Sequence, residues 1–223
     1  MRVTTTLLVL VLTLSFSAMG SGVKIGTDGK KWKVQKVEAN LDEGCRFAAE
    51  LPVTEHAGVF TRKNPPRGGM VVKPLPKSWN GRGLEDLYFQ LMCLDADKIL
   101  NENSEASFDP QTETWGKDIE KRIKALGYRL SPQEYRSAYE DFDKAIRVYN
   151  VTAVNAKGFV SIEDDTTGDE KGRMRHMGFC FINRLKALCG EGVVGYVSDG
   201  PKSDLTERAL EIIRTIEFLP NEE

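Results

Sequence analysis

The sequence predicts an α+β fold: an antiparallel sheet with helices packed against it, and a helical insertion between two groups of strands. Short β-rich runs bounded by turn residues occur on both sides of a segment with helical periodicity, and an amphipathic run closes the chain. Hydrophobic residues make up 40% of the 223 positions, which is enough for a core. We therefore expect one domain over residues 41–223, with its helical segment at 84–142.

The first strands are expected between Arg46 and Pro76. The runs RFAAELPV, AGVFTRK and GMVVKPLP have strand composition and are separated by turn chemistry such as NPPRGG. This order favours a three-stranded meander.

Helical periodicity begins at Leu84. Apolar residues recur at spacings of three and four, so LEDLYFQLMCLDADKILN predicts an amphipathic helix that carries Leu84, Leu87, Tyr88 and Leu91 on one face. This helix is expected to pack over the sheet.

Two further helices are expected before the strands resume. The run WGKDIEKRIKAL predicts a helix that ends at Gly127. The next helix should begin at Ser131, because Pro132 suits the first helical position and Glu134 completes a capping box.

The second group of strands is expected in KAIRVYNVTAV, KGFVSIED, RMRHMGFCFIN and GVVGYVSDG, which are rich in β-branched and aromatic residues. The last run, DLTERALEIIRTIEF, predicts a helix with Asp204 and Glu207 as a capping pair. Its apolar stripe should lie on the sheet and consists of Leu205, Ala209, Ile212, Ile213 and Ile216.

This order of elements and the ending ALEIIRTIEF resemble the PsbP-like fold of small exported α+β proteins of bacteria and plastids. The resemblance covers most of the chain after residue 20. It implies a non-enzymatic binding or assembly factor, since most proteins of that fold act in this way, but a fold alone does not supply a site.

The N-terminus predicts export. Residues 1–20 combine a basic Arg2, the apolar run LLVLVLTL and the ending AMG, which is the pattern of a secretory signal peptide. The run is shorter than the roughly 20 apolar residues of a membrane-spanning helix. We expect cleavage after Gly20, a polar arm at 21–40, and a soluble secreted or periplasmic protein without stable membrane insertion; the alternative is a retained N-terminal anchor.

The charge balance disfavours a nucleic-acid partner. The chain has 31 Lys and Arg against 33 Asp and Glu, whereas nucleic-acid-binding proteins usually show a clustered basic surface. A protein partner is therefore the expectation.

The four cysteines predict two disulfides, because export favours oxidation and an even count leaves none over. An antiparallel hairpin can bring Cys180 opposite Cys189, and Cys45 then pairs with Cys93 by exclusion. A cysteine nucleophile with a histidine base, or a structural zinc site, would be the alternative, but the spacing supports neither.

No motif for catalysis, a metal or a cofactor is recognisable, so we expect a non-enzymatic protein without a cofactor. The stretch EDDTTGDEKG offers carboxylates for calcium, but the spacing differs from that of an EF-hand and a solvated hairpin loop is the preferred interpretation. The glycosylation sequon at Asn150 lies in an expected strand and is interpreted as accidental.

Three functions remain as hypotheses. The leading one is an exported binding protein, such as an immunity or inhibitor protein that docks a toxin or another envelope protein. A hydrolase with a dispersed site, for example His176 with Asp199 and Ser198, is the second. An envelope assembly or lipid-handling factor is the third, and it predicts an apolar cavity between sheet and helix.

Two loops are the candidate binding sites, since exposed loops on a rigid scaffold commonly carry recognition. Each is also interpretable as a plain polar turn. The basic loop contains Arg62, Lys63 and Arg67, and the acidic loop at 163–172 contains Asp164, Asp165, Asp169 and Glu170.

Export is directly testable. Protein purified from its native host should begin near Ser21, because signal peptides are removed after translocation. Intact-mass measurement checks this, and a mass that still includes residues 1–20 contradicts it.

Overall fold

The structure is a computed structural model and describes residues 21–25, 31–41, 44–62, 67–75, 79, 83–102, 106–127 and 129–220. The expected signal peptide and Lys63 lie outside these residues. The described chain is of the predicted α+β class, with antiparallel sheets and helices against them.

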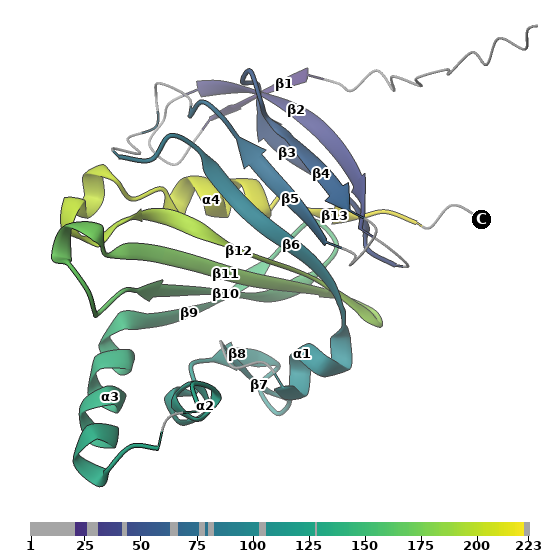
Figure 1. Cartoon of the computed structure of the whole chain (residues 1–223). Helices are drawn as coiled ribbons and strands as arrows, with labels where there is room; N and C mark the ends of the chain where they lie inside the picture. The colour runs from purple at the N-terminus through teal and green to yellow at the C-terminus, as the bar shows by residue number, and fades with distance from the viewer. Residues whose placement is uncertain are drawn as a thin grey trace, which may run out of the picture.

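A seven-stranded antiparallel sheet dominates the molecule. Its hydrogen bonds join strands from both ends of the sequence (Figure 1). In spatial order the strands are β4 (Gly58–Arg62), β5 (Arg67–Val72), β6 (Leu87–Asp95), β12 (Lys186–Tyr196), β11 (Met174–Asn183), β10 (Lys157–Asp164) and β9 (Ile146–Thr152).

A four-stranded sheet packs on one face of the larger sheet. It has the order β1 (Ser21–Ile25), β2 (Lys31–Asn40), β3 (Arg46–Pro52) and β13 (Glu217–Phe218). The predicted three-stranded meander is therefore divided, because β3 belongs to this sheet while β4 and β5 belong to the other.

The predicted polar arm at 21–40 is wrong. Much of it forms β1 and β2, and Trp32 and Val34 are buried. The run KWKVQKVEAN alternates apolar and polar residues in two phases, first at Trp32 and Val34 and then at Val37 and Ala39, so apolar side chains are buried or half-buried along the strand although its average composition is polar. The guanidinium carbon of Arg208 lies 4.6 Å from the Trp32 ring centroid, which adds a cation–π contact to this packing.

The main core lies between the two sheets and includes α4 (Thr206–Ile213). Figure 1 shows α4 between the four-stranded sheet and β12. Alternate residues of the large sheet point into this core, so the opposite side is a second face that we call the outer face. The largest fully buried side chains are Phe47, Phe89, Phe159, Phe179 and Phe181, and all but Phe159 belong to this core.

The helix predicted from Leu84 is wrong, because Leu87–Asp95 is strand β6 and only Ala96–Glu102 is helical, as α1. Leu87, Phe89 and Leu91 enter the core at a spacing of two, a pattern that the same run contains beside its helical one. Hydrogen bonding to β5 on one side and β12 on the other decides between the two patterns.

The insertion is helical only in part. After α1 it contains the hairpin of β7 (Ser107–Asp109) and β8 (Thr114–Gly116), and then α2 (Ile119–Ala125) and α3 (Pro132–Ala145). All of these gather at one end of the molecule (Figure 1). The predicted capping box is confirmed: the Glu134 amide donates to Ser131 Oγ, and the Ser131 amide donates to Glu134 Oε2.

The structure joins the cysteines in the pairing that the sequence predicts. Cys180 and Cys189 face each other on β11 and β12, with their Cα atoms 4.0 Å apart. Cys45, just before β3, pairs with Cys93, and these Cα atoms are 5.8 Å apart. Cys93 lies on a strand rather than on the expected helix, and its bridge ties the two sheets together.

The terminal helix supplies a test of the packing. Ile212 is 3% exposed in the main core, so Ile212→Ala should lower the free energy of unfolding by about 2–5 kcal/mol through lost burial and a residual cavity. Denaturant unfolding measures this. Glu207→Gln on the exposed side of the same helix is the control and should change the value by no more than about 0.5 kcal/mol; equal effects of the two changes contradict the packing.

Candidate functional site

An open groove of about 660 Å³ lies on the outer face of the large sheet. We call it the outer groove. Strands β6, β10, β11 and β12 form its floor, and α2 and the segment before β6 form its sides. The side chains that matter below are Asp86, Tyr88, Gln90, Arg122, Ser161, Glu163, Asp165, His176 and Glu191.

Strand register aligns the floor into a polar row. Ser161 on β10 is opposite Gly178 on β11, which in turn is opposite Glu191 on β12. Glu191 is opposite Gln90 on β6. Directly opposed residues have Cβ atoms about 5 Å apart, so Gln90 and Glu191 present neighbouring polar groups. Gly178 has no side chain, so the middle of the row is a depression in the floor.

Polar contacts hold the sides of the groove. Arg122 of α2 donates two hydrogen bonds to the Glu163 carboxylate, at 3.0 and 2.8 Å. His176 Nε2 lies 3.3 Å from Asp165 Oδ1. These contacts connect the insertion and the β10–β11 hairpin to the floor, so the groove is formed before any ligand arrives.

Glu191 and Gln90 have no such contacts. Within the described part of the chain, neither side chain has a hydrogen-bond or ion-pair partner. Glu191 is exposed and Gln90 is half-buried. Both therefore remain available to a ligand.

An exposed aromatic pair borders the groove. Phe60 of β4 and Tyr88 of β6 stack with ring centroids 6.2 Å apart and planes 16° apart. They cover Gly69 of β5, where an added Cβ would lie 2.3 Å from Phe60 Cζ and 2.7 Å from Tyr88 Cε2. Glycine at this position thus permits the stack, and Tyr88 adds an aromatic surface beside the acidic floor.

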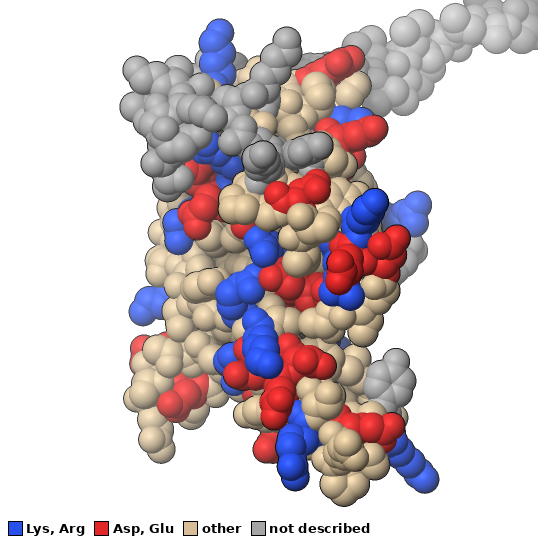
Figure 2. Space-filling model, turned by 90° about the vertical axis from the view of Figure 1, so that its left-hand side faces the viewer, with Lys and Arg blue, Asp and Glu red and all other residues tan. Residues whose placement is uncertain are grey.

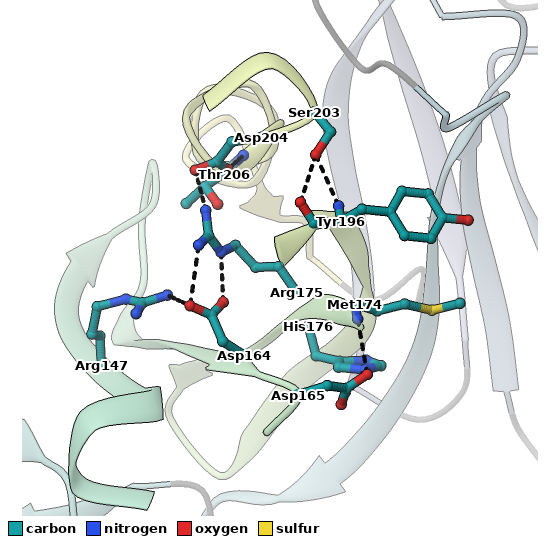
Figure 3. Close-up of polar contacts among 10 residues, drawn as sticks. All are labelled: Arg147, Asp164, Asp165, Met174, Arg175, His176, Tyr196, Ser203, Asp204 and Thr206. Atoms are coloured by element: carbon teal, nitrogen blue, oxygen red, sulfur yellow. Dashed lines mark hydrogen bonds and ion pairs between the residues drawn. The ribbon is translucent and has the colours of Figure 1, made fainter. Parts of the chain in front are cut away.

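The acidic loop at 163–172 is largely engaged in contacts within the chain. Asp164 accepts hydrogen bonds from Arg147 at 3.1 Å and from Arg175 at 2.6 and 3.1 Å, and Arg175 also pairs with Asp204 (Figure 3). Burial would raise the pKa of Asp164, but the hydrogen bonds and charges of Arg175 and Arg147 outweigh it and hold that pKa below its ordinary 3.8.

The remaining carboxylates of this loop divide into two kinds. Asp165 accepts from the Met174 amide at 2.9 Å, and Asp169 accepts from the Lys171 amide at 3.1 Å, so both stabilise turns. Glu170 is exposed. Acidic and basic side chains are mixed on this side of the molecule, without a large patch of one sign (Figure 2). Binding by the loop stays a prediction.

The structure describes two of the three basic residues of the basic loop. Arg62 on β4 is directly opposite Arg67 on β5, and both are exposed. Neither has a hydrogen-bond or ion-pair partner among the residues that the structure describes. The third member, Lys63, falls outside them.

The dispersed hydrolase site is not assembled within the described chain. The acidic partner of His176 is Asp165, and neither Ser198 nor Asp199 hydrogen-bonds to it. Across the described ranges no three His, Cys, Asp or Glu side chains converge to hold a metal ion. No helix in this part of the chain has the length and apolar character to cross a bilayer.

Sequence reasoning missed the groove because its floor comes from strands that pair over long distances. Tyr88, Gln90 and Glu191 alternate with core residues in β6 and β12. The alternation in LYFQLM indicates that Tyr88 and Gln90 face away from the core. The helical prediction for the same run leaves this pattern unused.

Comparison of the chain with family models, curated proteins and solved structures finds no match in any of the three. The resemblance to the PsbP-like fold therefore stays a prediction, and function has to be argued from the site.

The Asp164 network predicts a pH dependence of stability. A carboxyl whose pKa is depressed in the folded state stabilises the fold above its ordinary pKa, and this contribution is lost as the pH falls through the depressed value. Asp164→Asn should therefore cost about 1.5–3 kcal/mol at pH 7. The difference from the unsubstituted protein should shrink below pH 3.8.

Urea unfolding at several pH values checks this. Glu170→Gln removes an exposed carboxylate of the same loop and is the matched control, with little expected effect at any pH. A cost for Asp164→Asn that does not change between pH 7 and pH 3 contradicts the network as described.

Proposed function

We propose that this chain is an exported, non-enzymatic binding protein that docks a protein partner, and that the outer groove receives a basic segment of that partner. The observation that carries the proposal is a pair of polar side chains, Gln90 and Glu191, that have no partner among the described residues and lie on a groove floor otherwise fixed by internal contacts.

Charge complementarity supports a basic segment. Among the described residues, the groove is lined by four acidic residues, Asp86, Glu163, Asp165 and Glu191, against one arginine, Arg122. Arg122 is committed to Glu163, and in the part of the chain that the structure describes the ion-pair partner of Asp86 is Lys73, at 3.8 Å. A lysine or arginine entering the groove would thus meet uncompensated negative charge at Glu191, which favours association and fixes orientation.

The aromatic border supports the same chemistry. Tyr88 lines the groove and is 39% exposed, so its ring can contact the stem or guanidinium of an entering arginine. Aromatic residues are also enriched at the centres of protein interfaces.

The scaffold is suited to presenting such a surface outside the cytoplasm. Two disulfides tie β11 to β12 and one sheet to the other, and disulfides persist in oxidising compartments. Neutralisation of a toxin by occlusion is the form of docking that we favour, because inhibition of this type needs a rigid surface and no catalytic group.

Charge reversal on the groove floor tests the proposal. The mature protein and its Glu191→Lys and Glu102→Lys variants are immobilised, and retained proteins from an envelope extract are quantified at low and high salt. Glu102 is an exposed residue of α1, so the control has the same net charge but an intact groove.

At least one protein should be retained by the unsubstituted chain and by Glu102→Lys, and its retention by Glu191→Lys should fall about tenfold or more, since opposed like charges cost over 1.4 kcal/mol. Its retention should also weaken with salt. Equal retention by both variants, or no retained protein, would overturn the assignment of the groove.

A further inference from the structure

A second hollow lies on the same outer face, at the other end of the strands. It has a volume of about 430 Å³ and lies beneath the β7–β8 hairpin, so we call it the hairpin pocket. Its floor is a row of opposed residues, Thr152 of β9, Lys157 of β10 and Ile182 of β11. Its other lining side chains include Leu100, Phe108, Pro110, Glu113 and Trp115.

The walls of the pocket are apolar and aromatic. Trp115 is 7% exposed and packs between Phe108, at 5.1 Å between ring centroids, and Phe159, at 4.7 Å. Leu100 and Ile182 are half-buried beside them. Pockets of 300–1,000 Å³ with mainly apolar walls and a few polar groups are typical of small-molecule sites.

The hairpin that roofs the pocket is anchored. Asn150 of β9 accepts from the Trp115 amide at 2.6 Å and donates to the Trp115 carbonyl at 3.0 Å. The Asn150 side-chain amide therefore both donates to and accepts from the backbone of β8, as the backbone of a neighbouring strand would. The pocket is preformed, and the ordering cost of binding is correspondingly small.

Two opposite charges stand at the rim. Lys157 and Glu113 both line the pocket and are exposed, and in the described part of the chain neither has a hydrogen-bond or ion-pair partner. Glu113 also adopts a φ of 53°, a conformation that is uncommon for any residue other than glycine, Asn or Asp. Strained backbone conformations cluster at ligand-binding sites, and here the strained turn presents the Glu113 carboxylate at the pocket.

We propose that the hairpin pocket binds a small zwitterionic amphiphile. Its apolar group enters between Phe108, Trp115 and Ile182, its anionic group pairs with Lys157, and its cationic group pairs with Glu113. An apolar amino acid and the headgroup region of a single-chain zwitterionic lipid share this chemistry. The site is separate from the outer groove and does not depend on protein docking.

Titration of the mature protein tests this inference, with binding followed by calorimetry and by tryptophan fluorescence. The probes are L-leucine and L-phenylalanine as zwitterions, N-acetyl-L-leucine as the anion, L-leucinamide as the cation, and a lysophosphatidylethanolamine below its micellar concentration. The amino acids and the lipid distinguish the two sources of the ligand.

At least one zwitterionic probe should bind about tenfold more tightly than both the anion and the cation. Lys157→Gln and Glu113→Gln should each weaken this binding about tenfold. Lys157→Gln should remove the preference over the cation, and Glu113→Gln the preference over the anion. Lys124→Gln on α2 removes an exposed charge outside the pocket and should change nothing.

Three results would overturn the proposal. They are no binding of any zwitterionic probe at millimolar concentration, equal affinity for the zwitterions and their singly charged analogues, and binding that neither pocket variant alters. Thermal unfolding of each variant ensures that a loss of binding is not a loss of fold.

Discussion

The pairing of β6 with β12 is the constraint on which the outer face depends. It joins Leu87–Asp95 to Lys186–Tyr196, strands separated by the whole insertion. Without it, β4–β6 and β9–β12 would form two small sheets, and Gln90 would not face Glu191. The entropy of closing so long a loop grows only slowly with its length, so continuous hydrogen bonding and burial of Phe89 and Leu91 can offset it.

Local signals in the sequence predicted local structure well. The capping box at Ser131 and Glu134 involves residues three apart, and the β11–β12 disulfide closes a hairpin, so both needed little knowledge of the remaining fold. The α+β class and the packing of the terminal helix also followed from periodicity. The predicted capping pair of Asp204 and Glu207 is wrong, because α4 begins at Thr206 with Leu205 at the N-cap and no side-chain cap, and Glu217–Phe218 at the end of the predicted helical run is strand β13.

The errors arose where distant partners decide the outcome. The run LYFQLMCLD fits a helical and a strand period, and only its neighbours β5 and β12 select the strand. The sequence predicts a polar arm at residues 31–40 because their average composition is polar. In the fold, Arg208, which is remote in the sequence, covers Trp32 of this segment. The groove and the hairpin pocket were equally beyond prediction, because each is built from at least three segments whose proximity exists only in the folded chain.

The insertion divides the outer face into two chemically different halves. Its α2 supplies Arg122 to the outer groove, while its hairpin supplies Phe108 and Trp115 to the apolar pocket. Trp115, Phe159 and the Cys180–Cys189 bridge fill the space between them. Substitutions in the insertion can therefore alter either site while the core between the two sheets stays intact.

The opposed arginines of β4 and β5 have a consequence for self-association. Strand β4 is the last strand of the large sheet, and an open sheet edge is a template on which a second copy can add its own strand. Arg62 and Arg67 place two positive charges at one end of that edge, and an antiparallel neighbour would have to desolvate them without neutralising either. These charges oppose the addition of a strand at this end of β4.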